Sequence, residues 1–453
     1  TKNAQKTPKV PINVAGGDYT NFYLTGIYQP AAAQNAENAE CYIDGGRFSE
    51  VAGSGMQQVN GDVTWLINAA DITSFFGGGI NAAKPVTGSI STTISNSYVD
   101  EFYGGPKFGD MSAEKTVPTN ATDCHFGKFF AAGYGGTAYN RVGYVDDNSA
   151  ENTRDWDGYV DTHYGRAYSA DNKGISTNYE YEFIPHSDGK QTVARFFVNY
   201  ASLSLASTRD VTNTLSGCTI GTFYGGGSLG AVNGNINSTL TNCKVTGSTF
   251  GAGFSASVPT VEVWNKSAYL DPNPTYNRTA NVYNNANVKT PKDNNQYVVY
   301  TWSKTHGSNA NPLIDTEDGK HYIHTDVSLD GLGAVSGNVT LTLNGATTVG
   351  ESVYGGGEES GVGGNTTVVV ESGTIGVQGE GGAEYGNVYG AGSGSDTYTG
   401  DDGKEHYNPK SGMVGGNTFV NIAGGHVGRA VYGGGAMASV GTITSETKHE
   451  SIE

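Results

Sequence analysis

The chain has 453 residues, of which 68 are glycine and only 15% are charged. Its 26 lysine and arginine residues against 44 aspartate and glutamate residues give a formal net charge of −18, which argues against nucleic acid and anionic membrane surfaces as partners. No apolar run approaches about 18 residues, so we expect no membrane-spanning helix.

The N-terminal segment, residues 1–40, lacks the repeat that dominates the rest and is rich in alanine, asparagine and glutamine. We expect it to cap the open end of a solenoid, where terminal strands have unpaired edges. A degenerate first coil, CYIDGGRF, begins at Cys41. The chain begins without methionine or a signal peptide, so we expect a mature or trimmed product.

A sequence repeat with a spacing of 25 to 27 residues between successive uninterrupted copies runs through most of the chain. One copy reads RDVTNTLSGCTIGTFYGGG. A fixed period of this length indicates a solenoid, in which each unit buries its inner face only by stacking on its neighbours. The eight clear copies start at Gly61, Gly88, Lys115, Arg209, Gly234, Gly337, Gly364 and Gly416.

Within each copy, apolar residues alternate with polar ones, as at Val211, Leu215 and Ile220. This period of two is typical of short strands with one buried face, and no stretch has the apolar stripe of a helix. The sequence therefore predicts an all-β chain that forms a parallel β-helix of about 27 residues per coil and about eight or nine coils, stacked at about 4.8 Å.

Each copy ends in an aromatic pair and a glycine run, such as Phe223 and Tyr224 before glycines 225–227. The glycines predict a sharp corner that stacks closely on the next coil. We expect one aromatic of each pair to face inward and the other to form an outward ring.

Three of the four cysteines, Cys124, Cys218 and Cys243, lie nine positions after the start of their copies. Ala70, Ser97, Ala346, Gly373 and Gly425 hold the same position, so a column of small inward residues is the first interpretation. A Cys218–Cys243 disulfide is conceivable between adjacent strands, although parallel neighbours in register seldom give the required Cβ directions. No CxxC motif supports a metal site.

Three insertions interrupt a single β-helix domain that we place at residues 41–440, with a tail or continuation at 441–453. The first two are large and are expected to contain β-hairpins, one of them pairing residues 178–184 with 192–205. Insertions in solenoids tend to gather on one face, which is often the working face. Their predicted bounds are 135–208, 255–336 and 393–415.

The first insertion carries the densest polar and aromatic cluster of the chain, DWDGYVDTHYGR. Its DxDG start matches part of a calcium loop, with Asp155, Asp157 and Asp161 as oxygen ligands. A catalytic set of Asp155, Asp157, Asp161, His163 and Arg166 is a second hypothesis, and a solvated loop is the plain interpretation. No cofactor other than calcium is implied.

Exposed aromatic residues on the insertions offer faces that stack on sugar rings, which makes glycans candidate partners. The alternative is that these residues pack the insertions onto the rod. The candidates are Trp156, Tyr159, Tyr164, Trp264, Tyr300 and Trp302.

The recurring GNVT…C.I…FYGGG signature, with GDVTWLINAADITSFFGGGINAAKPVTG at residues 61–88, resembles the large adhesin-like or pectin-lyase-like surface proteins of gut Bacteroidetes. The resemblance covers the coils, about half of the chain. It implies a right-handed parallel β-helix, secretion, and an extracellular or bacterial cell-surface location. It brings no catalytic residues, because the motifs of pectate lyases and polygalacturonases have no match here.

Three functional hypotheses follow. The first is a non-enzymatic β-helix protein, adhesin-like or structural, that contacts glycans or surface components of host or bacterial cells through its insertions. The second is a polysaccharide lyase or glycoside hydrolase acting in a groove between the insertions. The third is a phage tailspike or fibre module, which requires a trimer. A fold alone does not decide among them.

Overall fold

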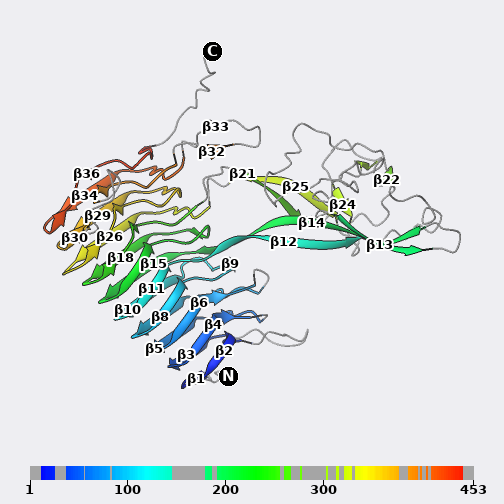
Figure 1. Ribbon diagram of the computed structural model, residues 1–453, viewed down its shortest axis with the longest axis horizontal. Helices are drawn as coiled ribbons and strands as arrows, with labels where there is room; N and C mark the ends of the chain where they lie inside the picture. Colours follow the sequence, from blue (N-terminus) through cyan, green and yellow to red (C-terminus); the bar gives the residue numbers. More distant parts are fainter. Residues whose placement is uncertain are drawn as a thin grey trace, which may run out of the picture.

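A computed structural model gives the architecture of the chain (Figure 1). It describes residues 12–25, 37–55, 57–81, 84–144, 179–185, 191–255, 260–266, 276–277, 303–304, 313–315, 321–328, 332–376, 386–395, 398–399, 405–406 and 410–441.

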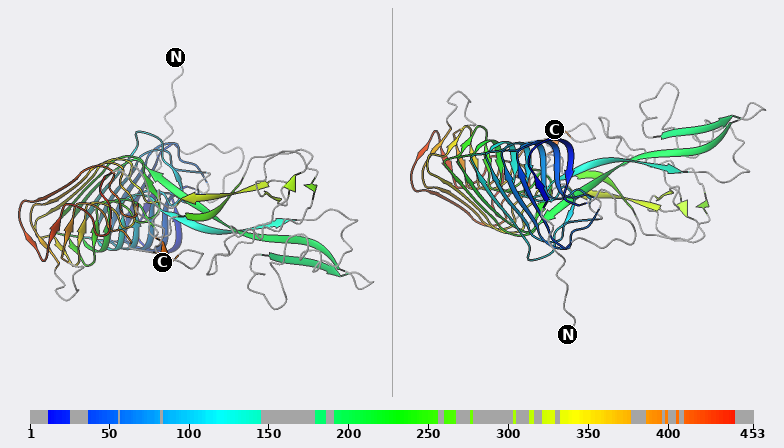
Figure 2. Two further views of the ribbon diagram at one scale, coloured as in Figure 1. Left: turned by 90° about the horizontal axis from the view of Figure 1, so that it is seen from above. Right: turned by 90° about the horizontal axis from the view of Figure 1, so that it is seen from below.

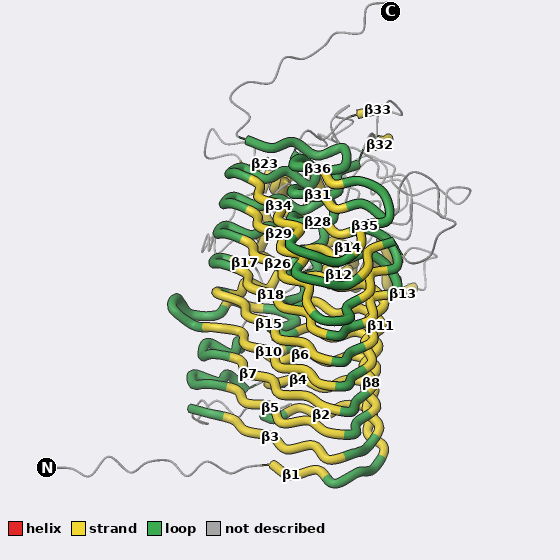
Figure 3. The backbone as a smooth tube through the Cα atoms, turned by 90° about the vertical axis from the view of Figure 1, so that its left-hand side faces the viewer, coloured by secondary structure: helices red, strands yellow, loops and turns green. Residues whose placement is uncertain are grey.

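The first long sheet has ten strands, all parallel and all joined in register (Figure 3). Thr214, for example, lies between Asn120 of one neighbouring strand and Thr239 of the other. In order across the sheet the strands are β1 (Ile12–Val14), β3 (Ala39–Asp44), β5 (Val63–Asn68), β7 (Ile90–Ser95), β10 (Thr116–Thr122), β15 (Asp210–Ser216), β18 (Ile236–Thr241), β26 (Val339–Asn344), β29 (Thr366–Val370) and β34 (Thr418–Ile422).

The second long sheet is also parallel, and each coil contributes to it directly after its strand in the first sheet. Its strands are β2 (Asp18–Tyr23), β4 (Arg47–Ser54), β6 (Asp71–Gly79), β8 (Tyr98–Tyr103), β11 (His125–Phe130), β16 (Thr219–Tyr224), β19 (Lys244–Val245), β27 (Thr348–Val349), β30 (Thr374–Ile375) and β35 (His426–Val427), continued by β20 (Thr249–Phe250), β28 (Val353–Tyr354), β31 (Val388–Tyr389) and β36 (Val431–Tyr432).

The third side of each coil is narrow, and isolated parallel bridges between valines connect the coils there. Val335 bridges Val232 on one side and Val362 on the other, and Val414 continues the series to Val440. Three sides therefore enclose one core, and the parallel β-helix predicted from the repeat is confirmed.

The described residues form ten coils, slightly more than the eight or nine that the repeat predicts. The additional coil comes from β1 and β2, which lie within the segment expected to act as a cap and pair in register with β3 and β4. Their sequence, INVAGGDYTNFY, lacks the glycine corner after its aromatic pair, so the pattern that marks the other coils is missing there.

A run of stacked phenylalanines fills part of the core. Phe75, Phe102, Phe129 and Phe223 stack face to face, with ring centroids 4.7 to 5.3 Å apart. All four are fully buried. They are the inward members of the aromatic pairs, as predicted.

The insertions form small antiparallel sheets that project from one side of the rod (Figures 1 and 2). In the first, β12 (Gly135–Tyr144) and β13 (Tyr179–Pro185) flank β14 (Gln191–Thr208), which confirms the predicted hairpin. The other insertion strands are β21 (Thr260–Lys266), β22 (Tyr276–Asn277), β23 (Ser303–Lys304), β24 (Leu313–Asp315), β25 (His321–Ser328), β32 (Tyr398–Thr399) and β33 (Glu405–His406), with β9 (Gly109–Asp110) and β17 (Ala231–Val232) beside the base of β14.

Candidate functional site

All three insertions leave the rod at the same corner of the coil. The first begins directly after Tyr134, the second after Phe254 and the third after Ser393, in each case four residues beyond an aromatic residue of the second sheet. Tyr134 and Phe254 both bridge to Ser228, which holds this position on the coil between them. On the coil with Ser228, a single turn connects this corner to the next side of the same coil. The corner can therefore hold either a short turn or an inserted sheet.

The insertions occur on alternate coils. The coils whose outer aromatic residue is Phe130, Phe250 or Tyr389 carry an insertion. The two coils between them, with Tyr224 and Tyr354 at this position, have none. Two coils span roughly 9.6 Å at the usual strand spacing, which nearly equals the ~10 Å between sheets packed face to face. Strand β14 of the first insertion and strand β21 of the second run close together (Figure 2).

Most residues predicted to form a site lie outside the part of the chain that the structure describes. The cluster at 155–166, including the proposed calcium and catalytic residues, falls in this category, as do Tyr300 and Trp302. Trp264 is on β21, where its backbone pairs opposite His324 of β25. The calcium, catalytic and sugar-stacking assignments therefore stay predictions.

The outer members of the aromatic pairs form a second stacked column outside the inner core, as predicted. Its rings are buried from Phe76 to Tyr354, Tyr389 is partly buried, and Tyr432 on the last coil is 47% exposed. Neighbouring rings are 4.5 to 5.1 Å apart. Tyr134 packs edge-on against Tyr103 at 5.3 Å, and Phe254 packs edge-on against Tyr224 at 6.2 Å. These two covering residues begin the insertions, so the column anchors the insertion stems to the rod.

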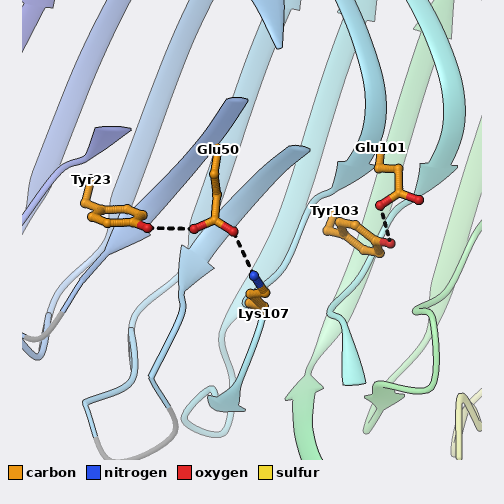
Figure 4. Close-up of polar contacts among 5 residues, drawn as sticks. All are labelled: Tyr23, Glu50, Glu101, Tyr103 and Lys107. Carbon is orange, nitrogen blue, oxygen red and sulfur yellow. Dashed lines mark hydrogen bonds and ion pairs between the residues drawn. The ribbon is translucent and has the colours of Figure 1, made fainter. Parts of the chain in front are cut away.

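Polar groups beside this column are paired within the rod (Figure 4). Tyr23 donates a hydrogen bond to Glu50 Oε1 and Lys107 Nζ donates one to Oε2, both at 2.7 Å. Lys107 also lies over the Phe76 ring, 4.8 Å from its centroid, a cation–π contact. Further along, the Tyr103 hydroxyl donates to Glu101 at 3.4 Å.

Burial opposes ionisation of Glu50, but the hydrogen bonds from Lys107 and Tyr23 outweigh it and lower the pKa of this carboxyl. Burial and the hydrogen bond to Glu50 raise the pKa of Tyr23 to about 12. The ion pair and the neutral phenol are therefore both stable at neutral pH. These hydrogen bonds link side chains of three different coils.

Replacing Lys107 with methionine is expected to lower the free energy of unfolding by about 2 kcal/mol at pH 7, because Glu50 keeps its charge and loses its cation. Because the pKa of Glu50 is lower in the folded state, its ion pair stabilises the fold at pH values above the unfolded-state pKa. This contribution disappears as the pH falls through the folded-state pKa. Urea unfolding at pH 7 and pH 3 should therefore show a large difference from the wild type only at pH 7. Lys128→Met, at an exposed position of β11, should be nearly neutral at both values.

A second group of carboxylates lies at the insertion corner of the coil that carries Tyr354. The Tyr224 hydroxyl donates a hydrogen bond to Glu358, and Ser248 Oγ donates to Glu351 Oε2 at 2.8 Å. Burial, with the adjacent charge of Glu358, raises the pKa of Glu359 to about 7. Glu359 is thus the described carboxyl most suited to hold a proton near neutral pH.

Because the pKa of Glu359 rises from 4.5 to about 7 on folding, the folded state binds this proton more tightly and stability falls as the pH rises through that window. The Glu359→Gln variant has no carboxyl to ionise, so its folded state is not destabilised when the pH rises. The variant should melt at a higher temperature than the wild type at pH 8 and at the same temperature at pH 4.5. A matched Glu371→Gln variant, at an exposed site, should leave both temperatures unchanged; an equal rise in both variants would contradict the assignment.

Within the described ranges, no three histidine, cysteine, aspartate or glutamate side chains converge to hold a metal ion. The same ranges contain no helix long and apolar enough to cross a membrane. The described architecture is that of a parallel β-helix solenoid with lateral sheets. No protein-family model matches the chain, and neither a curated protein nor a solved structure is significantly similar to it.

Proposed function

We propose that this chain is a non-enzymatic, extracellular or cell-surface β-helix protein, adhesin-like or structural, whose insertions form the contact face for glycans. The observation that carries the proposal is the grouping of the insertions: they leave one corner of the rod on alternate coils and project to the same side (Figure 2). Such spacing lets separate insertions pack into one composite surface.

The chemistry of the rod supports the same proposal. Its half-buried carboxylates Glu50, Glu351 and Glu358 accept hydrogen bonds from side chains one or two coils away. Groups held in this way link coils to one another. The rod thus acts as a rigid scaffold, and recognition is assigned to the lateral sheets, in the manner of loops positioned by a stable framework. A bacterial surface setting, as in gut Bacteroidetes, belongs to this proposal.

The test is to incubate the full chain with a panel of plant, host and bacterial polysaccharides, with and without calcium, and to measure both retention and released products. We expect retention on at least one polysaccharide without new reducing ends or unsaturated uronates. Release of either product would overturn the non-enzymatic proposal and favour the lyase or hydrolase hypothesis, with its candidates at 155–166. If the protein were retained on a polysaccharide only when calcium is present, calcium would be part of the contact face.

A pair of variants locates the contact. Trp264→Ala, on insertion strand β21, should weaken retention. Tyr98→Ala removes an aromatic side chain that is 48% exposed on the rod and should leave retention unchanged. The reverse result would move the contact face from the insertions to the rod.

A further inference from the structure

Cys124, Cys218 and Cys243 occupy one position on three consecutive coils. The residue after each cysteine is paired in register with its counterparts, His125 with Thr219 and Thr219 with Lys244. All three thiols are free and buried. The column of small inward residues predicted from the sequence is therefore correct for the cysteines, although Thr347 and not Ala346 continues it, because Thr348 N bonds to Cys243 O.

The three side chains also share one orientation. Each thiol donates a hydrogen bond to the carbonyl oxygen two residues before it, at 3.2 Å for Cys124 and 3.4 Å for Cys218 and Cys243. Parallel side chains on hydrogen-bonded strands repeat at the strand spacing. We therefore expect the Cβ atoms of adjacent cysteines, and the sulfur atoms that they carry, to be about 4.8 Å apart.

This spacing disfavours a disulfide. A disulfide requires Cβ atoms about 3.5 to 4.5 Å apart and a turned dihedral angle, so closing one would pull two coils out of register. The Cys218–Cys243 disulfide considered from the sequence is not formed, since both thiols are free. At the expected spacing of about 4.8 Å, adjacent sulfur atoms lie too far apart for an S–S bond.

The same distance suits two sulfur atoms on opposite sides of one soft metal ion. A zinc–thiolate bond is about 2.3 Å long. If a soft monovalent ion forms bonds of similar length, two collinear bonds span about 4.6 Å. We propose that Cys218, together with Cys124 or Cys243, binds one monovalent soft cation of the copper(I) and silver(I) class in linear two-sulfur coordination. Thiolate ligands select such ions. This site needs only two sulfur ligands, so it is compatible with the finding that no three metal-ligating side chains converge in the described ranges.

The charges balance without leaving an ion in the core. The cation displaces the proton of one thiol and forms a metal–thiolate bond, while the neighbouring thiol keeps its proton and donates a sulfur lone pair. One proton is released per cation and the buried unit is neutral, which avoids the cost of an unpaired buried charge. Only Cys218 has a thiol neighbour on both adjacent coils, so it is the sulfur common to both possible pairs.

The ends of the column limit the site to these three sulfurs. Ser97 precedes Cys124 and bonds to Ser95 O at 2.7 Å, and Thr347 follows Cys243 and bonds to Asn344 O at 2.6 Å. Hydroxyl oxygens are poor ligands for soft cations. Cys41 provides a matched reference, because it is equally buried but has Ile12 and Trp65 as its column neighbours.

The experiment loads the full chain with silver nitrate in chloride-free buffer and challenges it with an excess of N-acetylcysteine, a monothiol that removes singly bound silver. Long incubation allows entry through local opening of the coil. We expect one retained silver ion and one released proton per chain. X-ray absorption should give two sulfur neighbours.

Serine variants separate the two-sulfur site from simple thiol binding. Cys218→Ser should lose the retained silver, because the remaining two thiols are two coils apart. At least one of Cys124→Ser and Cys243→Ser should keep it, as should Cys41→Ser, and circular dichroism should show the fold intact in all four. Full retention by Cys218→Ser, loss in both flanking variants, or no retention by the wild type would overturn the proposal.

Discussion

Phe129→Ala is expected to lower the free energy of unfolding by about 3 to 5 kcal/mol. Phe129 is fully buried on a central coil, stacked between Phe102 at 4.7 Å and Phe223 at 5.3 Å, with Phe126 edge-on at 5.1 Å. Truncation removes the ring from both stacks and leaves a cavity that the rigid coils cannot close. Urea denaturation followed by circular dichroism measures the effect.

Phe419→Ala is the matched control, because Phe419 is 55% exposed on β34. Its effect should stay within about 0.5 kcal/mol. In a solenoid the loss is concentrated near the altered coil, so amide exchange in Phe129→Ala should accelerate first in β8, β11 and β16. Equal destabilisation by the two variants would contradict the assignment of Phe129 to the inner column.

Gly253→Ala should destabilise the protein by roughly 3 kcal/mol. A Cβ atom at Gly253 would lie 2.5 Å from Gly227 O and 2.6 Å from Gly333 O, closer than carbon and oxygen approach in proteins. Both obstacles are backbone carbonyls, and Gly227 O already accepts a hydrogen bond from Phe254 N at 2.9 Å. The clash can be relieved only by separating the coils at the base of the second insertion.

The control for this prediction is Gly434→Ala, in the glycine corner of the last coil. A Cβ atom there meets nothing within 4 Å. Thermal unfolding should be almost unchanged for Gly434→Ala and shifted strongly downward for Gly253→Ala. If neither substitution changed the unfolding temperature, this would contradict the close stacking of the glycine corners.

Much of the fold was predictable from the sequence, because nearly every coil repeats the same local sequence pattern. Alternating residues such as Val211 and Leu215 define buried faces, and the glycine corners define coil length. The coil formed by β1 and β2 was missed because its corner has no glycine run. Alternation correctly places the outer aromatic rings outside the inner core, but it does not predict that the returning chain, including Tyr134 and Phe254, covers them.

The site was less predictable because it depends on contacts between distant residues. Glu50 and Lys107 are 57 positions apart, and Tyr224 and Glu358 are 134 apart. No local pattern pairs them. The alternate-coil placement of the insertions becomes visible only when the coils are stacked, which brings the coil ending in Tyr224 between those that end in Phe130 and Phe250.

The central claim is that the rod is a scaffold and the insertions form the contact face. The most direct measurement uses a variant in which residues 135–205 are replaced by a single leucine, because Leu229 alone joins the equivalent positions on the next coil. Its binding to the polysaccharide panel is compared with that of the full chain, with cooperative thermal unfolding as the check on the rod. We predict that the rod still unfolds cooperatively and that polysaccharide retention is lost. A folded rod that retains polysaccharide as strongly as the full chain would contradict this account.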